Sequence, residues 1–188
     1  MSALPRVLAF AGSARRESLN RKFLAAAAAA TREAGATVTV VELSDFPLPL
    51  YDGDLEDSGG LPDNARKLAA LMASHDALLV ASPEYNAMLT PLLKNTIDWC
   101  SRAEDNAFGG KVAAVISASP GAMGGMRSLL QAQQLLLKLG CHVVPGQCAL
   151  PGAAKAFDAS GHLLDPRAEK SLRTLVAALV ATARKLAA

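Results

Sequence analysis

A group of hydroxyl, guanidinium and amide side chains follows the first apolar segment of the chain. Residues 12–20 read GSARRESLN and lead into an alanine-rich stretch. The hydroxyls of Ser13 and Ser18 and the guanidinium of Arg15 can bind phosphate oxygens, and the N–H groups at the start of a helix favour an anion. Gly12 allows the backbone to turn tightly. We therefore expect a phosphate site in this loop.

The glycine pattern of the same loop limits the kind of phosphate. Residues 12–20 match neither GxGxxG, the dinucleotide fingerprint, nor GxxxxGK[ST], the loop that binds nucleoside triphosphates. A monophosphate is the better interpretation. The alternative is an ordinary helix start, with Ser18 as the N-cap and the arginines in water.

A second unusual segment lies farther along the chain, where residues 82–86 read SPEYN. A flat aromatic ligand needs an apolar wall and a few fixed hydrogen-bond partners. Pro83 and Tyr85 can form such a wall, and the main-chain N–H groups of residues 84–86 can bind ring carbonyls and nitrogens. The alternative is a rigid turn between a strand and a helix.

Apolar segments of strand length alternate with helix-forming segments along the whole chain. The expected strands are Val7–Ala11, Thr37–Leu43, Ala77–Ala81, Lys111–Ala118 and Cys141–Leu150, the last bent at Pro145-Gly146. The expected helices are Leu19–Ala34, Pro62–Ser74, Thr90–Arg102, Met126–Leu139 and Pro166–Ala187. Residues 46–60 are expected to form a long loop with a possible helical turn.

This alternation predicts a parallel sheet with helices on both faces. Two strand orders remain open, that of the dinucleotide-binding fold and the flavodoxin-like order 2-1-3-4-5. In either fold, ligands bind outside the carboxyl ends of the strands. Both polar loops follow expected strands, and so does a third, glycine-rich loop that contains Ser119 and Gly121.

Length and composition exclude several classes of protein. The 188 residues suit one domain, and a net charge of +2 argues against a nucleic-acid binder. No apolar run is long enough to span a membrane. Three cysteines without a C-x-x-C pair favour a reducing cytoplasm and argue against a metal site. The histidines at positions 75, 142 and 162 are scattered, so we expect no catalytic side chain among them.

Taken together, the motifs resemble the NAD(P)H-dependent FMN reductase family, which includes bacterial quinone, chromate and azo-dye reductases. The resemblance rests on GSxRxxSxN at residues 12–20, PEYN at 83–86 and PxLKNxIDW at 91–99, and it extends through the glycine-rich loop to residue 125. The segment after Leu150 carries no family motif.

The resemblance implies a flavodoxin-like three-layer α/β sandwich, with a five-stranded parallel sheet of order 2-1-3-4-5 in one domain over residues 1–188. It also implies non-covalent FMN and a homodimer or homotetramer. Trp99 and Arg102 are expected at the subunit interface. The alternative for Trp99 is a buried position in the core of the monomer. The residues implied to bind the cofactor are Gly12, Ser13, Arg15, Ser18, Leu19, Asn20, Pro83, Glu84, Tyr85, Asn86, Ser119 and Gly121.

In the reaction implied by this resemblance, NAD(P)H gives a hydride to FMN, and a small-molecule acceptor then takes the electrons. A quinone is the expected acceptor, and chromate, azo and nitro compounds are further candidates. Two other functions stay open: a flavodoxin-type electron carrier, and a reductase that supplies reduced FMN to a partner monooxygenase. A protein without a cofactor is a third alternative.

Overall fold

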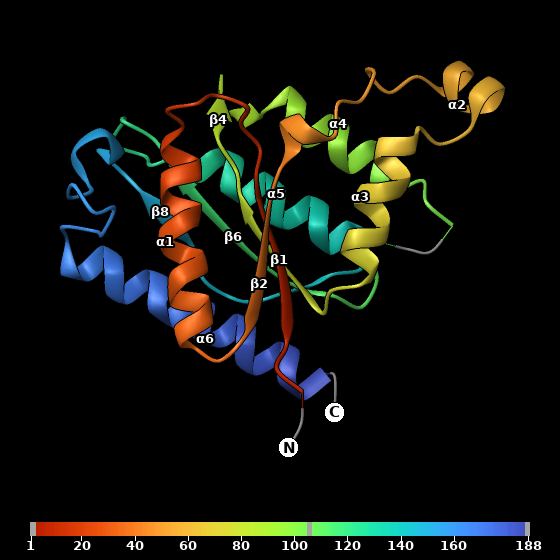
Figure 1. Cartoon of the computed structure of the whole chain (residues 1–188). Helices are drawn as coiled ribbons and strands as arrows, with labels where there is room; N and C mark the ends of the chain where they lie inside the picture. Colours follow the sequence, from red (N-terminus) through yellow and green to blue (C-terminus); the bar gives the residue numbers. More distant parts are fainter. Residues whose placement is uncertain (1–2, 105–106, 187–188) are drawn as a thin grey trace.

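The computed structural model describes residues 3–104 and 107–186, which form a parallel sheet with helices against both faces (Figure 1). The strands of this sheet are β1 (Arg6–Ala11), β2 (Thr37–Glu42), β3 (Ala77–Ala81), β6 (Val112–Ala118), β7 (His142–Val143) and β8 (Cys148–Leu150). Their order is β2-β1-β3-β6-β7, and β8 also pairs with β6 in parallel. This confirms the flavodoxin-like order, with β7 and β8 as two parts of the bent fifth strand.

Each face of the sheet is covered by its own set of helices. Successive residues of a strand point to opposite faces, so Val7 and Ala9 of β1 face one helix layer while Leu8 and Phe10 face the other. The first layer contains α1 (Leu19–Glu33) and α6 (Pro166–Leu186). The second contains α3 (Asp63–Ala73), α4 (Pro91–Cys100) and α5 (Met126–Lys138). All residues of β3 and β6 are buried because both faces are covered.

The predicted helices agree with these five to within two residues at each end. Ala187, the last residue of the predicted final helix, lies outside the described residues. No helix among residues 3–104 and 107–186 combines the length and apolar character needed to cross a membrane.

The remaining elements lie in the connections. A short 3-10 turn, η1 (Leu43–Asp45), follows β2, and the long loop after it contains the helix α2 (Gly53–Gly59). A second short turn, η2 (Ala153–Lys155), follows β8. The segment after β3, read from the sequence as a loop, forms a small antiparallel hairpin of β4 (Glu84–Tyr85) and β5 (Met88–Leu89). Two-residue strands leave too little apolar alternation to be recognised in the sequence.

Trp99 lies in the core of the chain and holds the long loop against α4. Its side chain is fully buried, and its Nε1 donates a hydrogen bond of 2.8 Å to the carbonyl of Pro49. Asn95 Nδ2 donates to the same carbonyl at 2.8 Å, and the Tyr51 ring packs edge-on against the indole at 5.0 Å between centroids. Of the two sequence interpretations for Trp99, the structure therefore selects the core.

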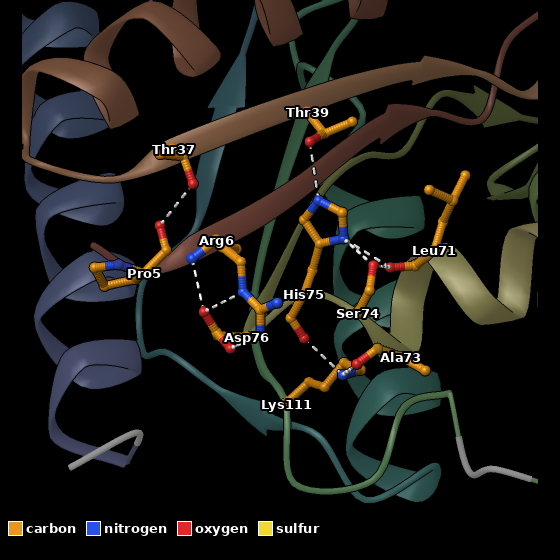
Figure 2. Close-up of polar contacts among 10 residues, drawn as sticks. All are labelled: Pro5, Arg6, Thr37, Thr39, Leu71, Ala73, Ser74, His75, Asp76 and Lys111. Carbon is orange, nitrogen blue, oxygen red and sulfur yellow. Dashed lines mark hydrogen bonds and ion pairs between the residues drawn. The ribbon is translucent and has the colours of Figure 1, made fainter. Parts of the chain in front are cut away.

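Polar contacts join the strands at their amino ends, opposite the edge where the polar loops lie (Figure 2). The main-chain N–H of Arg6 donates to Asp76 Oδ2 at 2.7 Å, and its Nη2 donates to Oδ1 at 2.9 Å. Lys111 Nζ donates to the carbonyl of His75 at 2.7 Å. The side-chain hydrogen bond from Arg6 lowers the pKa of the Asp76 carboxyl, against the opposing effect of burial. These contacts join the starts of β1, β3 and β6.

We expect Asp76→Asn to lower the free energy of unfolding at pH 7 by about 1.5 kcal/mol, the lower end of the usual contribution of a hydrogen bond to a charged group, because the Arg6 side chain is exposed. Because the folded-state pKa of Asp76 is lowered, its contribution is complete above its unfolded-state pKa and is lost as the pH falls through the folded-state value. Urea unfolding at pH 7, 4 and 2.5 measures this. As the pH falls, the free energy of unfolding should decrease less in the variant than in the parent protein. An equal decrease in both proteins would contradict the role assigned to Asp76.

Candidate functional site

An open groove of about 400 Å³ lies at the carboxyl ends of the strands. It brings together most of the residues that the sequence pointed to, namely Ser13, Arg15, Ser18, Leu19, Asn20, Pro83, Glu84, Tyr85 and Ser119. Gly12, Asn86 and Gly121 belong to the same loops but do not line the groove. Glu17, Ala118, Pro120 and Ala154 complete its wall and were not singled out from the sequence. We call it the loop groove.

The loop after β1 offers several hydrogen-bond donors that an anion could accept. Ser18 is the N-cap of α1, and its Oγ accepts from the main-chain N–H of Arg21 at 3.3 Å, while Ser13 Oγ accepts from Arg15 N at 3.3 Å. Both hydroxyls keep a hydrogen to donate. Among the described residues, no partner accepts from the main-chain N–H groups of Ala14 and Glu17 or pairs with the Arg15 guanidinium. This donor set suits a phosphate at a helix N-terminus.

Gly12 is required by the packing of α4 against the end of β1. A Cβ atom on Gly12 would lie 2.6 Å from the Cβ of Leu93, closer than two carbons can approach. The hydroxyl of Thr90 donates to the Gly12 carbonyl at 2.6 Å, and the Gly12 N–H donates to the carbonyl of Ala81 at 2.9 Å. Gly12 therefore joins β1, β3 and the start of α4, and fixes where the loop begins.

Asn20 links α1 to the third loop. Its Nδ2 donates to the carbonyl of Ala118 at 2.8 Å, and its Oδ1 accepts from the N–H of the same residue at 2.9 Å. The side chain is buried, and one N–H of its amide remains for a ligand. In this geometry Asn20 positions Ser119 relative to the loop after β1.

The hairpin β4–β5 forms the opposite wall of the loop groove. Its two turn residues, Asn86 and Ala87, have φ angles of 51° and 66°, which L-residues other than asparagine and aspartate seldom adopt. Two-residue hairpin turns require such angles because their twist then matches that of the strands. Tyr85 is 47% exposed, so one aromatic side chain stands at the mouth of the groove.

The start of α5 fixes the hairpin in place. The Glu84 carboxylate accepts from the main-chain N–H of Arg127 at 3.0 Å, from its Nε at 2.8 Å and from Ser128 N at 3.3 Å. Burial raises the pKa of Glu84, but the Arg127 guanidinium and the main-chain donors outweigh it and hold the pKa below its ordinary value. The Ser128 hydroxyl donates to the carbonyl of Pro83 at 2.7 Å.

Sequence reasoning missed this support from α5, although one signal was present. The helix has no acidic residue in its first turn and begins after Gly125, which has no side chain to cap it. A helix N-terminus of this kind favours a carboxylate supplied from elsewhere in the chain. Glu84 supplies it, and Gln131 adds a second link by donating to the carbonyl of Ala87 at 3.0 Å.

The third loop and the segment after β8 close the floor of the loop groove. The N–H of Ser119 donates to the carbonyl of Leu150 at 3.1 Å, and the N–H of Ala153 donates to the carbonyl of Ser119 at 3.0 Å. Gly121 N donates to Ser119 Oγ at 3.2 Å, which holds that hydroxyl near the groove. Ala154 follows in η2 and lines the groove directly, so the chain beyond Leu150 contributes to the site without any recognisable motif.

Comparisons with known proteins show which family the chain belongs to. A family model described as NADPH-dependent FMN reductase matches residues 5–155. An NAD(P)H-dependent FMN reductase of Pseudomonas aeruginosa is 36% identical over 186 residues, covering 96% of each chain. A probable NADPH:quinone oxidoreductase of Oryza sativa is 35% identical, over 96% of this chain and 90% of that protein. The solved structure of a flavoenzyme NAD(P)H:acceptor oxidoreductase from Paracoccus denitrificans has a TM-score of 0.80 at 29% identity, covering 97% of this chain and 98% of its own.

The turn of the hairpin generates a test of stability. We expect Ala87→Gly to leave stability unchanged or raise it by up to about 1 kcal/mol, because glycine adopts a positive φ without a Cβ clash. Ala87→Val should destabilise the protein, since a branched side chain is least tolerated there. Thermal unfolding measures both. Ala181→Gly on the exposed face of α6 is the matched control and should cost about 1 kcal/mol. An equal loss in both glycine variants would contradict the strained turn.

Proposed function

The chain belongs to the NADPH-dependent FMN reductase family, and on this premise we propose that it catalyses electron transfer from NAD(P)H, through non-covalently bound FMN, to a quinone or a similar small acceptor. Chromate, azo and nitro compounds are further candidate acceptors. The observation that carries the proposal is the loop groove, in which an anion-binding loop and an aromatic-bearing hairpin face each other at the carboxyl ends of the strands.

The residues present fit FMN. Ser13, Arg15 and Ser18 would hold its phosphate, because they offer two hydroxyls and a guanidinium without an ion-pair partner among the described residues. Pro83 and Tyr85 would contact the flat ring from the hairpin side. Bound FMN supplies the acceptance and release of a hydride or of electrons, so the family does not need an acid–base pair of side chains here.

The protein contributes orientation and electrostatics. The hairpin is fixed by α5 through Glu84, and the negative charge of that carboxylate is balanced by Arg127, so the hairpin side of the groove would present no uncompensated charge to the ring. The groove is open, and the half-exposed Tyr85 stands at its mouth. An open face of this kind admits the nucleotide and the acceptor in turn and sets few limits on the shape of the acceptor.

We propose further that the chain acts as one FMN-binding domain over residues 1–188, in the cytoplasm, as a homodimer or homotetramer. One parallel sheet with a helix layer on each face organises the described residues, which supports the single domain. The three cysteines are buried and unpaired, and burial raises the pKa of Cys100 and Cys141 to about 12 and that of Cys148 to about 11. Such thiols are inert and suit a reducing compartment. Size-exclusion chromatography with light scattering tests the oligomeric state.

An absorption spectrum of the purified protein tests the function. We expect flavin bands that NADPH or NADH bleaches under anaerobic conditions and that a quinone restores without any partner protein. A colourless protein that takes up no added FMN would contradict the proposal. Recovery of the bands only with a protein partner would indicate an electron carrier, and turnover that rises in proportion to added free FMN would indicate a supplier of reduced flavin.

Arg15 allows a sharper test of the phosphate position. We expect Arg15→Ala to weaken FMN binding about tenfold or more, the effect of losing one charge-assisted hydrogen bond, and Arg15→Lys to recover part of it. Flavin fluorescence on dilution of the holoprotein measures the dissociation constant. Arg66→Ala on α3 is the matched control, because it removes the same charge from an exposed arginine away from the groove. Full flavin occupancy in diluted Arg15→Ala would overturn the assignment.

A further inference from the structure

The turn of the hairpin β4–β5 has a conformation that its own sequence does not favour. Asn86 and Ala87 have φ angles of 51° and 66°. A two-residue turn of this kind requires a positive φ at both positions, and its favoured pair is Asn-Gly. Asparagine suits the first position, whereas alanine at the second position meets a steric cost. Contacts from elsewhere in the chain must therefore hold Ala87 in this conformation.

Gln131 of α5 supplies such contacts. Its Nε2 donates to the carbonyl of Ala87 at 3.0 Å, and its Oε1 accepts from the main-chain N–H of Leu89 at 3.2 Å. One side chain thus holds both the turn and the strand β5 that follows it. Gln131 is half-buried, so water competes less for these hydrogen bonds than it would at the surface.

The base of the hairpin is held about one helical turn earlier on α5. The Ser128 hydroxyl donates its only hydrogen to the carbonyl of Pro83 at 2.7 Å, so the hydroxyl of Ser82 is the donor in its 2.6 Å contact with Ser128. The Glu84 carboxylate binds the Arg127 guanidinium and the main-chain N–H of the same residue. The base of the hairpin therefore has several independent contacts.

The tip of the hairpin depends on one side chain. Among residues 3–104 and 107–186, only Gln131 forms a hydrogen bond with either turn residue. Removing this side chain would free the tip and leave the base in place. Tyr85 lies next to the turn and lines the loop groove, so its position depends on the tip. Strained turns that are held in this way occur most often at functional sites.

Resting on the proposed function, we propose that Gln131 is a positioning residue for the flavin ring, because it holds the strained turn and thereby keeps Tyr85 beside the ring. Gln131 does not line the loop groove, so its effect passes through the backbone of Ala87. A hairpin whose tip is already fixed loses less conformational entropy when the ring binds, which raises the affinity for the ring. The phosphate contacts of Arg15 lie on the other loop and do not depend on Gln131.

Two flavins separate the ring from the phosphate, since riboflavin carries the ring alone and FMN carries both. Fluorescence titration of the full chain, freed of flavin, measures each dissociation constant. We expect Gln131→Leu to weaken riboflavin and FMN binding by the same factor, about tenfold, because the turn loses the hydrogen bonds that hold it. Gln134→Leu, the same change at an exposed position of α5, is the matched control and should behave like the parent protein.

Ala87→Gly provides a rescue that distinguishes positioning from a general structural role. Glycine adopts a positive φ without a steric cost, and Asn-Gly favours this turn without outside support. In the Ala87→Gly protein, we expect the change Gln131→Leu to weaken riboflavin binding less than about threefold. The circular dichroism of the bound flavin reports the surroundings of the ring. It should change in Gln131→Leu and return toward the parent signal in the double variant.

Unchanged riboflavin binding in Gln131→Leu would overturn the proposal. An equal loss with and without Ala87→Gly would also overturn it, because Gln131 would then not act through the turn, and so would a loss for FMN alone. If Gln131→Leu does not fold, Gln131→Glu tests the same contact, since its carboxylate still accepts from Leu89 but cannot donate to Ala87. Failure of the proposed function is distinguishable, because the parent protein itself would then bind neither flavin.

Discussion

The close approach of β1 to α4 at Gly12 is the constraint on which the site depends. Leu93 occupies the space where a Cβ of residue 12 would stand, and Thr90, the N-cap of α4, donates a hydrogen bond to the carbonyl of Gly12. The carboxyl ends of β1 and β3 are thereby fixed relative to one helix, and the loop after β1 leaves the sheet in a single direction. A phosphate site built from main-chain N–H groups needs this constraint, because those groups have no side-chain freedom with which to correct a displaced loop.

A second constraint comes from the start of α5, where the hairpin supplies the charge that the helix lacks. Glu84 satisfies main-chain donors of α5 and pairs with Arg127, so the contact that caps the helix also positions Tyr85. The positive φ values of Asn86 and Ala87 persist because these contacts hold both ends of the turn. The loop after β1 is thus fixed by the β1–α4 contact, and the hairpin that carries Tyr85 is fixed by α5. The two meet across β3, which leads into the hairpin.

The parts of this protein that could be predicted from the sequence are those whose cause is local. The strands are buried on both faces and so are apolar at every position, and the N-cap role of Ser18 follows from its place before an uninterrupted helix. The rest depends on contacts between distant segments. The sequence shows that Asn20 lies near the loop after β1, but only the fold shows that its side-chain amide is hydrogen-bonded to the main chain of Ala118. The contribution of Ala154 arises from its neighbours in space, and an alanine carries no chemical signal of its own.

The groups suited to binding the cofactor phosphate and the open side of the groove lie on different loops. The groups suited to a cofactor phosphate lie in a loop whose serines are buried and whose backbone is fixed, whereas the hairpin side of the groove is open at Tyr85. In the proposed reaction the enzyme would keep FMN bound while the electron donor and the acceptor reach the same ring in turn. Tight contacts to the phosphate and loose contacts at the ring would satisfy both requirements, because affinity for FMN would then not depend on closing the face on which the electrons move.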